Sequence, residues 1–263
     1  MDNSTSFESR ESAWKALYLM GGVAAFLAVI VFRRFFAVEL MTFNGFGIFE
    51  VPPSEPTTAL EWFGLLERNK LVGLILLGIV DLINYALVGL LFLAVYGALR
   101  KASEIAMGLA IILSMISISV YCASNQALNF LYLNEQFQVA TDDAQRAIYL
   151  GAGEALSAKV QGTGWYVSLF LIYLAGLIIS LVMQRTKVFN KATAWTGILA
   201  NSFGLLLFPA LIFTPTIIWL PPSLSAPFRV TWYVLIAIKL FKLAKGREKE
   251  NNAHSVQTAR NGE

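Results

Sequence analysis

Long apolar runs separated by short polar segments dominate this chain. A helix needs about 20 apolar residues to cross a hydrocarbon core about 30 Å thick, because each residue adds about 1.5 Å of length. Six runs reach or approach this length, at residues 14–36, 71–99, 105–133, 165–183, 192–213 and 228–243. The pattern therefore predicts an all-α fold, a six-helix transmembrane bundle in one domain.

Both ends of the chain are polar. Residues 1–13 form a head of mixed charge, residues 14–245 form the membrane domain, and residues 246–263 form a polar tail that we predict to be disordered. The head lacks the basic segment of a cleaved signal peptide. We therefore expect the first apolar run to be retained as a membrane span.

Two polar segments between the runs, residues 56–70 and 141–160, are predicted to be amphipathic helices in the outer loops. Thr57 or Thr58 is suited to cap the first and Thr141 or Asp142 the second, since threonine and aspartate side chains accept hydrogen bonds from a first helical turn. We expect Trp62 to lie at the level of the lipid headgroups, where tryptophan is enriched.

Prolines predict two irregularities. Pro209 is expected to kink the fifth span, because it supplies no backbone N–H. Four prolines between residues 214 and 227 predict a tight outer hairpin instead of regular helix throughout.

The charged residues predict the orientation. With the N-terminus inside, 13 of the 20 Lys and Arg residues fall on the inner side and seven on the outer side. Short inner loops rich in Lys and Arg indicate the cytoplasmic side, so we predict N-in/C-in. Arg33 and Arg34 oppose this bias. The basic inner loops and the tail are expected to attract anionic lipid headgroups. The basic residues form no continuous face, so nucleic-acid binding is not expected, and no protein partner can be named.

Composition narrows the function. Hydrophobic residues make up 57% of the chain and charged residues 14%, against about 45–50% and about 25% in soluble domains. The single cysteine and single histidine are too few for a structural zinc site of about four ligands. We expect no metal, no cofactor and no enzymatic activity. An enzyme acting on lipids would have to use Glu61, Glu67 or Glu154 near the membrane surface.

Asp81 is the main candidate for a functional residue. A carboxylate that faces lipid in mid-membrane costs roughly 2.5–3.5 kcal/mol or more, so Asp81 is expected to face other helices or water. At 1.5 Å per residue, Asp81 lies about 15 Å below the outer end of the second span, and polar residues of three other spans reach a similar depth. The predicted polar pocket consists of Asp81, Asn84, Tyr85, Tyr121, Asn125, Tyr173 and Asn201.

Two interpretations of these polar residues remain open. They line an outward-facing pocket for transport or permeation, or they hydrogen-bond one another as the structural core of a non-catalytic sensor, partner subunit or assembly factor. Arg229, at the outer start of the sixth span, is expected to anchor at the headgroups; pairing with an acid or an anionic substrate is the alternative.

Three segments carry a resemblance to a known family: LLFLAVYGALRK (residues 90–101), GTGWYVSLFLIYLAGLIISLVMQRTKVFNK (162–191) and ATAWTGILA (192–200). This order of spans and short basic turns is similar to a six-span prokaryotic integral-membrane family that is catalogued only as a domain of unknown function. The resemblance implies a multi-pass protein of a prokaryotic cell membrane. It implies no activity and no catalytic residues.

Overall fold

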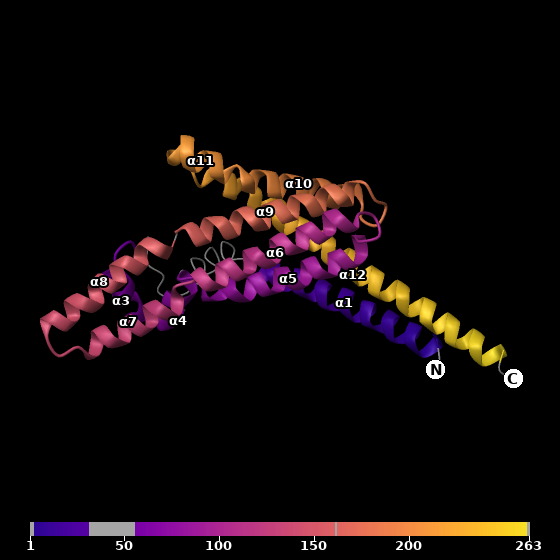
Figure 1. Cartoon of the computed structure of the whole chain (residues 1–263), viewed down its shortest axis with the longest axis horizontal. Helices are drawn as coiled ribbons and strands as arrows, with labels where there is room; N and C mark the ends of the chain where they lie inside the picture. The colour runs from indigo at the N-terminus through magenta and orange to yellow at the C-terminus, as the bar shows by residue number, and fades with distance from the viewer. Residues whose placement is uncertain (1–2, 32–55, 161, 262–263) are drawn as a thin grey trace, which may run out of the picture. The chain divides into compact units, whose positions relative to one another are not determined.

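The computed structural model describes residues 3–31, 56–160 and 162–261 (Figure 1). All regular structure in these ranges is helical. Six helical stretches there are long and apolar enough to cross a membrane: Ser12–Val31, Ile79–Leu99, Glu104–Val139, Asp143–Gln184, Lys191–Phe213 and Pro215–Gly246. The predicted all-α class and the multi-pass membrane character are confirmed. Orientation across the membrane stays a prediction.

The described ranges contain eleven α-helices and one 3-10 helix. They are α1 (Asn3–Val31), α3 (Ala59–Arg68), α4 (Lys70–Leu76), α5 (Ile79–Leu99), α6 (Glu104–Ser124), α7 (Ala127–Val139), α8 (Asp143–Val160), α9 (Thr163–Gln184), α10 (Lys191–Leu205), α11 (Leu207–Phe213), the 3-10 helix η1 (Pro215–Ile217) and α12 (Leu220–Asn261).

The chain divides into two compact units. Unit 1 comprises residues 1–29, 87–115 and 170–263, and unit 2 comprises residues 30–86 and 116–169. Helices α1, α5, α6 and α9 contribute residues to both units. Each unit is described by itself below.

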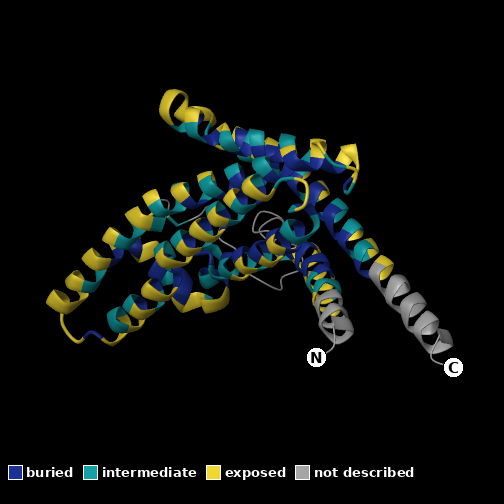
Figure 2. Cartoon of the chain, turned by 45° about the vertical axis from the view of Figure 1, so that its right-hand side comes forward, coloured by how far each residue is buried: buried dark blue, intermediate teal, exposed yellow. Residues whose placement is uncertain are grey.

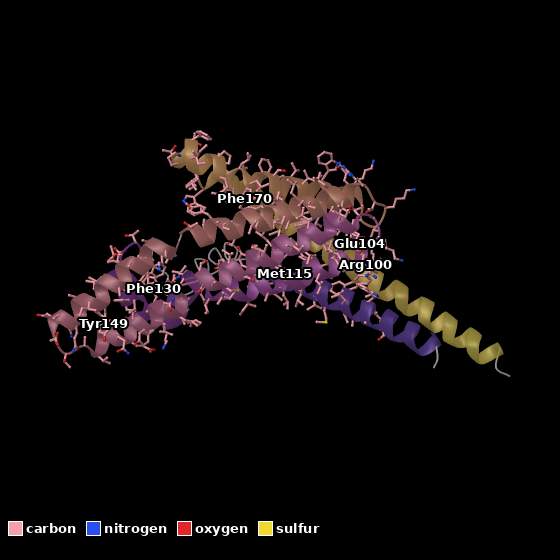
Figure 3. The ribbon with its side chains drawn as sticks, viewed as in Figure 1. Arg100, Glu104, Met115, Phe130, Tyr149 and Phe170 are labelled. Carbon is pink, nitrogen blue, oxygen red and sulfur yellow. The ribbon has the colours of Figure 1, made fainter. Side chains whose placement is uncertain are left out.

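In unit 1, α10 packs along α12. Trp232 of α12 is fully buried, and its ring centroid lies 6.0 Å from that of Phe92 on α5. Near the end of α5, the Arg100 guanidinium (Figure 3) lies 4.3 Å from the centroid of the Trp14 ring on α1. These aromatic contacts hold helices that are far apart in the sequence against one another.

In unit 2, the short helices α3 and α4 pack with α7 and α8. Phe130, labelled in Figure 3, is fully buried there, and its ring centroid lies 5.9 Å from that of Trp62. Trp62 itself is only 2% exposed. Helix α3 therefore turns this ring into a protein core, and its level relative to the lipid headgroups stays a prediction.

Helix α3 begins with the predicted threonine cap. The Thr58 side chain accepts a hydrogen bond from the Glu61 backbone N–H at 3.3 Å, and the Glu61 carboxylate accepts one from the Thr58 N–H at 3.2 Å. A further bond from the Thr57 N–H, at 2.7 Å, is the largest of the contacts that lower the pKa of Glu61. Helix α8 is capped by Asp142, which accepts from the Gln145 N–H at 2.8 Å. Figure 2 shows α8 as mostly exposed. The position of these helices in outer loops stays a prediction.

Two apolar runs are not single helices, contrary to the sequence interpretation. The run 71–99 is broken between α4 and α5, where Gly78 adopts a φ of +86°, a conformation that glycine takes without steric cost. The run 105–133 is broken at Asn125 and Gln126, between α6 and α7. Hydrophobicity alone does not mark either break, because apolar residues continue on both sides.

The proline-rich segment also differs from the expectation. Helix α12 starts at Leu220, earlier than the predicted span, and contains Pro227. Pro221 and Pro222 fit its first turn, where the backbone N–H groups need no helical acceptor. Only η1 and its flanking residues form the turn. The predicted interruption of the fifth span is present as the boundary between α10 and α11, just before Pro209.

Helix α12 also continues into the polar tail. The structure is helical to Asn261, and the disorder of the tail stays a prediction. Residues that favour helix, such as alanine, lysine, arginine and glutamate, extend a helix that is already nucleated by the apolar part of α12. The side chains after residue 246 lie outside the described part, and the domain boundary at residue 245 stays a prediction.

Candidate functional site

In unit 2, the backbone between α4 and α5 does not form regular helical hydrogen bonds. The Gly78 N–H donates to the Ile75 carbonyl at 3.0 Å, and the Gly78 carbonyl accepts from the Asp81 N–H at 3.2 Å. These turn-like bonds replace the regular helical ladder over this stretch. The Leu77 and Gly78 carbonyl oxygens are thereby presented to Asn125, which follows α6, and the Gly78 oxygen also to Tyr121 of α6.

Asn125 connects this break to the second one. Its Nδ2 donates to the Gly78 oxygen at 3.1 Å and to the Leu77 oxygen at 3.4 Å. Its Oδ1 accepts from the Ala127 N–H at 3.1 Å, at the start of α7. The Asn125 side chain thus hydrogen-bonds backbone carbonyls that follow α4 and a backbone N–H at the start of α7.

Asp81 lies at the same place, in the first turn of α5. Its Oδ2 accepts a hydrogen bond from the Tyr121 hydroxyl at 3.1 Å, and the same hydroxyl lies 3.5 Å from the Gly78 oxygen. Asp81 is 9% exposed. A hydrogen bond to a charged group is worth about 1.5–3 kcal/mol, and the N-terminal end of a helix adds about 0.3–1 kcal/mol for an anion.

We call Leu77, Gly78, Asp81, Tyr121 and Asn125 the junction cluster. Its polar atoms are carboxylate, carbonyl, hydroxyl and amide groups, which are the hard ligands of small cations. Among the described residues, no group of three or more His, Cys, Asp and Glu side chains is placed to hold a metal ion. The cluster is therefore an oxygen-rich site with a single carboxylate.

Tyr85 extends the cluster on the side of α9. Its ring stacks on the Tyr121 ring with centroids 4.1 Å apart, and its hydroxyl shares a hydrogen bond of 3.2 Å with the Ser168 Oγ. The Ser117 Oγ donates to the Ser168 carbonyl at 2.7 Å. Sequence reasoning missed Ser168, because a single serine in an apolar run gives no signal beyond its small size.

Asn84 is not brought into the junction cluster by any hydrogen bond among the described residues. Its Oδ1 is buried without a hydrogen-bond partner in that part of the chain. The i+3 spacing from Asp81 placed both on one helical face, as predicted from periodicity, but a shared face does not ensure contact.

Tyr173 and Asn201, the other two predicted pocket residues, belong to unit 1. There the Arg229 guanidinium lies 4.4 Å from the centroid of the Tyr173 ring, and Arg229 Nη2 donates to the Ser225 Oγ at 3.4 Å. Asn201 Nδ2 donates to the Gly197 carbonyl at 2.7 Å. We call Tyr173, Ser225 and Arg229 the arginine cluster.

The helix breaks change the depth estimate. Asp81 is the third residue of α5, so counting about 15 Å along one continuous helix from residue 71 is wrong. Asn125 likewise follows the end of α6. The predicted layer shared by Asp81, Asn84, Tyr121, Asn125, Tyr173 and Asn201 stays a prediction.

Arg229 also differs from its expected role. It is 7% exposed and packs against a tyrosine ring, so it is not a solvent-facing headgroup anchor. The starting point of α12 explains the error. The sequence interpretation began the span at residue 228, whereas α12 begins at Leu220 and carries Arg229 into the bundle.

Comparison with known protein families, curated proteins and solved structures gives no match to this chain.

Proposed function

We propose that this multi-pass membrane protein moves a small monovalent cation, a proton or a small polar solute, and that the junction cluster is the site that holds it. The observation that carries the proposal is the meeting of Asp81 with two helix breaks. The proposal includes no catalytic step.

Broken helices inside a membrane have a specific physical consequence. Non-helical backbone is tolerated at membrane depth only where protein buries it or where it lines an aqueous cavity. In many transporters, discontinuous helices present carbonyl oxygens and helix ends to the transported ion. Leu77 and Gly78 supply such carbonyls here, and Asp81 supplies one negative charge beside them. A single carboxylate matches a cation of single charge.

A second function is favoured by one contact. Asn125 Nδ2 already donates to both carbonyls, so the same geometry serves as a fully bonded structural core. In that case the chain is a non-catalytic sensor, partner subunit or assembly factor. Interhelical hydrogen bonds of this kind average about 0.6 kcal/mol in membranes.

We place the protein in a prokaryotic cell membrane, with both termini in the cytoplasm. The bias of Lys and Arg along the sequence and the family resemblance support this placement. Anionic lipids at the basic inner loops belong to the same proposal.

The test is flux through the purified full chain in proteoliposomes. Uptake of radioactive sodium and acidification reported by a trapped dye are measured for the wild type, Asp81→Asn and Tyr121→Phe. Asp143→Asn is the matched control, since Asp143 is an exposed aspartate in the first turn of α8. We expect Asp81→Asn to abolish flux, Tyr121→Phe to reduce it, and the control to retain it.

The opposite result separates the two functions. Flux that is equal in wild type and Asp81→Asn removes Asp81 from transport. If neither probe moves, and Asp81→Asn lowers only the unfolding temperature, the junction cluster is a structural core.

A further inference from the structure

Arg229 places a positive charge deep in an apolar helix of unit 1. At 1.5 Å per residue, it lies about 14 Å along α12 from Leu220 and about 15 Å from Lys239, the next charged residue. A helix that crosses a hydrocarbon core about 30 Å thick between these two residues has Arg229 near its middle. A guanidinium stays charged at any ordinary pH, and a charged side chain inside a membrane is costly and marks function by default.

The described part of the chain supplies no negative charge to Arg229. Neither an aspartate nor a glutamate forms an ion pair with it there. Its contacts are neutral: the Tyr173 ring, whose centroid lies 4.4 Å from the guanidinium carbon, and the Ser225 Oγ, which accepts from Nη2 at 3.4 Å. The guanidinium also hydrogen-bonds the Tyr233 hydroxyl, one turn further along α12. A buried charge of this kind requires an opposite charge to compensate it.

Several hydrogen-bond donors around Arg229 have no acceptor among the described residues. The guanidinium has five N–H bonds, of which the Ser225 and Tyr233 oxygens accept only a part. The hydroxyl protons of Tyr173 and Tyr233 also have no acceptor there. The unpaired polar atoms that protein seals completely are, in the described ranges, others: Asn84 Oδ1, Asn201 Oδ1 and Trp232 Nε1. The free donors of this site therefore face a space that a water-sized molecule or ion reaches.

The surroundings of these donors favour a small ion. Arg229 and Tyr173 are each 7% exposed and Tyr233 is 3% exposed, so the access is narrow. The Tyr173 ring also packs tightly on Gly204 of α10, where a Cβ would lie 2.6 Å from two ring carbons, and it has little room to move aside. One guanidinium without an acid matches an anion of single charge.

We propose that the arginine cluster, together with the Tyr233 hydroxyl, binds one small monovalent inorganic anion, a halide such as chloride. The anion pairs with the guanidinium and accepts the hydroxyl protons of Tyr173 and Tyr233, in charge-assisted hydrogen bonds. It neutralises the charge that α12 carries into the membrane. The site lies within unit 1, and the proposal does not depend on transport through the junction cluster.

The test is the line width of the chloride NMR signal, measured while chloride is titrated into the full chain in phosphatidylcholine nanodiscs. Gluconate, a large organic anion, keeps the ionic strength constant, and empty discs give the blank. We expect a broadening that saturates with chloride and is displaced by bromide. Chloride is also expected to raise the thermal unfolding temperature relative to gluconate, because a ligand that binds only the folded protein stabilises it.

The variants assign the contacts of the anion. Arg229→Gln is expected to weaken chloride binding at least tenfold, and Arg229→Lys, which keeps the charge, to weaken it less. Tyr173→Phe and Tyr233→Phe each remove a hydroxyl and keep the ring, and each is expected to weaken binding about fivefold, the loss of one hydrogen bond. The controls are Arg185→Gln and Tyr132→Phe, which alter an exposed arginine after α9 and an exposed tyrosine of α7 and are expected to change nothing.

Three results would overturn the proposal. Broadening no greater than that of empty discs shows that the protein has no chloride site. Equal broadening in the wild type and Arg229→Gln removes the guanidinium from the site. If that variant does not fold, equal broadening in the wild type and the protein that combines Tyr173→Phe with Tyr233→Phe removes the site instead. Loss of the broadening at saturating chloride when phosphatidylglycerol replaces phosphatidylcholine assigns the guanidinium to a lipid phosphate and not to a free anion.

Discussion

Replacing Gly78 by alanine tests the physical basis of the junction cluster. The backbone at Gly78 has a φ of +86°, and a residue with a Cβ in the left-handed region loses about 1–2 kcal/mol. A Cβ there would also lie 2.8 Å from the Tyr121 hydroxyl oxygen and 3.3 Å from Asp81 Oδ2. Displacing the hydroxyl removes an interhelical hydrogen bond, worth about 0.6 kcal/mol in membranes. The two effects together are about 2 kcal/mol, roughly a thirtyfold change in the unfolding equilibrium.

The assay is reversible unfolding of the purified chain in mixed micelles, followed by tryptophan fluorescence. Gly78→Ala combined with Tyr121→Phe separates the two effects, since removal of the hydroxyl relieves the crowding but leaves the backbone strain. Gly151→Ala is the control. Gly151 is exposed in α8, and a Cβ there meets nothing within 4 Å, so alanine is expected to stabilise the helix by about 0.5–1 kcal/mol. A Gly78→Ala protein as stable as wild type would refute the reasoning.

Two further predictions concern stability. The pKa of Glu61 is lowered in the folded protein, so the Glu61 carboxylate stabilises the fold above pH 4.5, its ordinary pKa, and this stabilisation is lost as the pH falls through the lower folded value. In Glu61→Gln, the thermal unfolding temperature is therefore expected to depend less on pH between pH 5 and pH 3. The same pH dependence in the variant and the wild type would contradict this prediction. A Cβ on Gly176 would overlap the Asn201 side chain, so Gly176→Ala is expected to cost about 1–3 kcal/mol in the same unfolding assay. Adding Asn201→Ala to this variant is expected to recover most of the lost stability. Gly108→Ala is the control and is expected not to destabilise the protein, because a Cβ there meets nothing within 4 Å. If Asn201→Ala does not recover the stability, the overlap is not the cause of the loss.

The membrane spans illustrate what the sequence predicts well. The run at residues 165–183 needed only length and hydrophobicity, and its ends agree with those of α9 (Thr163–Gln184) within two residues. The caps of α3 and α8 were also predictable, because Thr58 and Asp142 act on backbone groups only three residues away. Local interactions of this kind are encoded in neighbouring residues.

The helix breaks illustrate what the sequence does not predict. Gly73 and Gly78 stand in the same apolar run, yet Gly73 is helical within α4 and Gly78 has a positive φ. Glycine permits both conformations at little steric cost. The choice at Gly78 coincides with acceptance of hydrogen bonds from Asn125, 47 residues further along the chain. The residues around Gly78 in the sequence do not predict such a long-range contact.

The candidate site shows the same division. Asp81, Tyr85, Tyr121 and Asn125 were recognised as polar residues in apolar surroundings, and contacts of unit 2 bring them together. Arg229 was recognised as a charge but placed at a surface. Its burial depends on the start of α12 and on the Tyr173 ring against which it packs.

By itself, the sequence determined that the chain consists of apolar helices able to cross a membrane, because a bilayer imposes one length and one polarity on every span. Only the tertiary structure decided where those helices break and which polar groups meet at the breaks. The reason is that a buried carbonyl or carboxylate needs a partner, and for these residues the partners come from helices remote in the sequence.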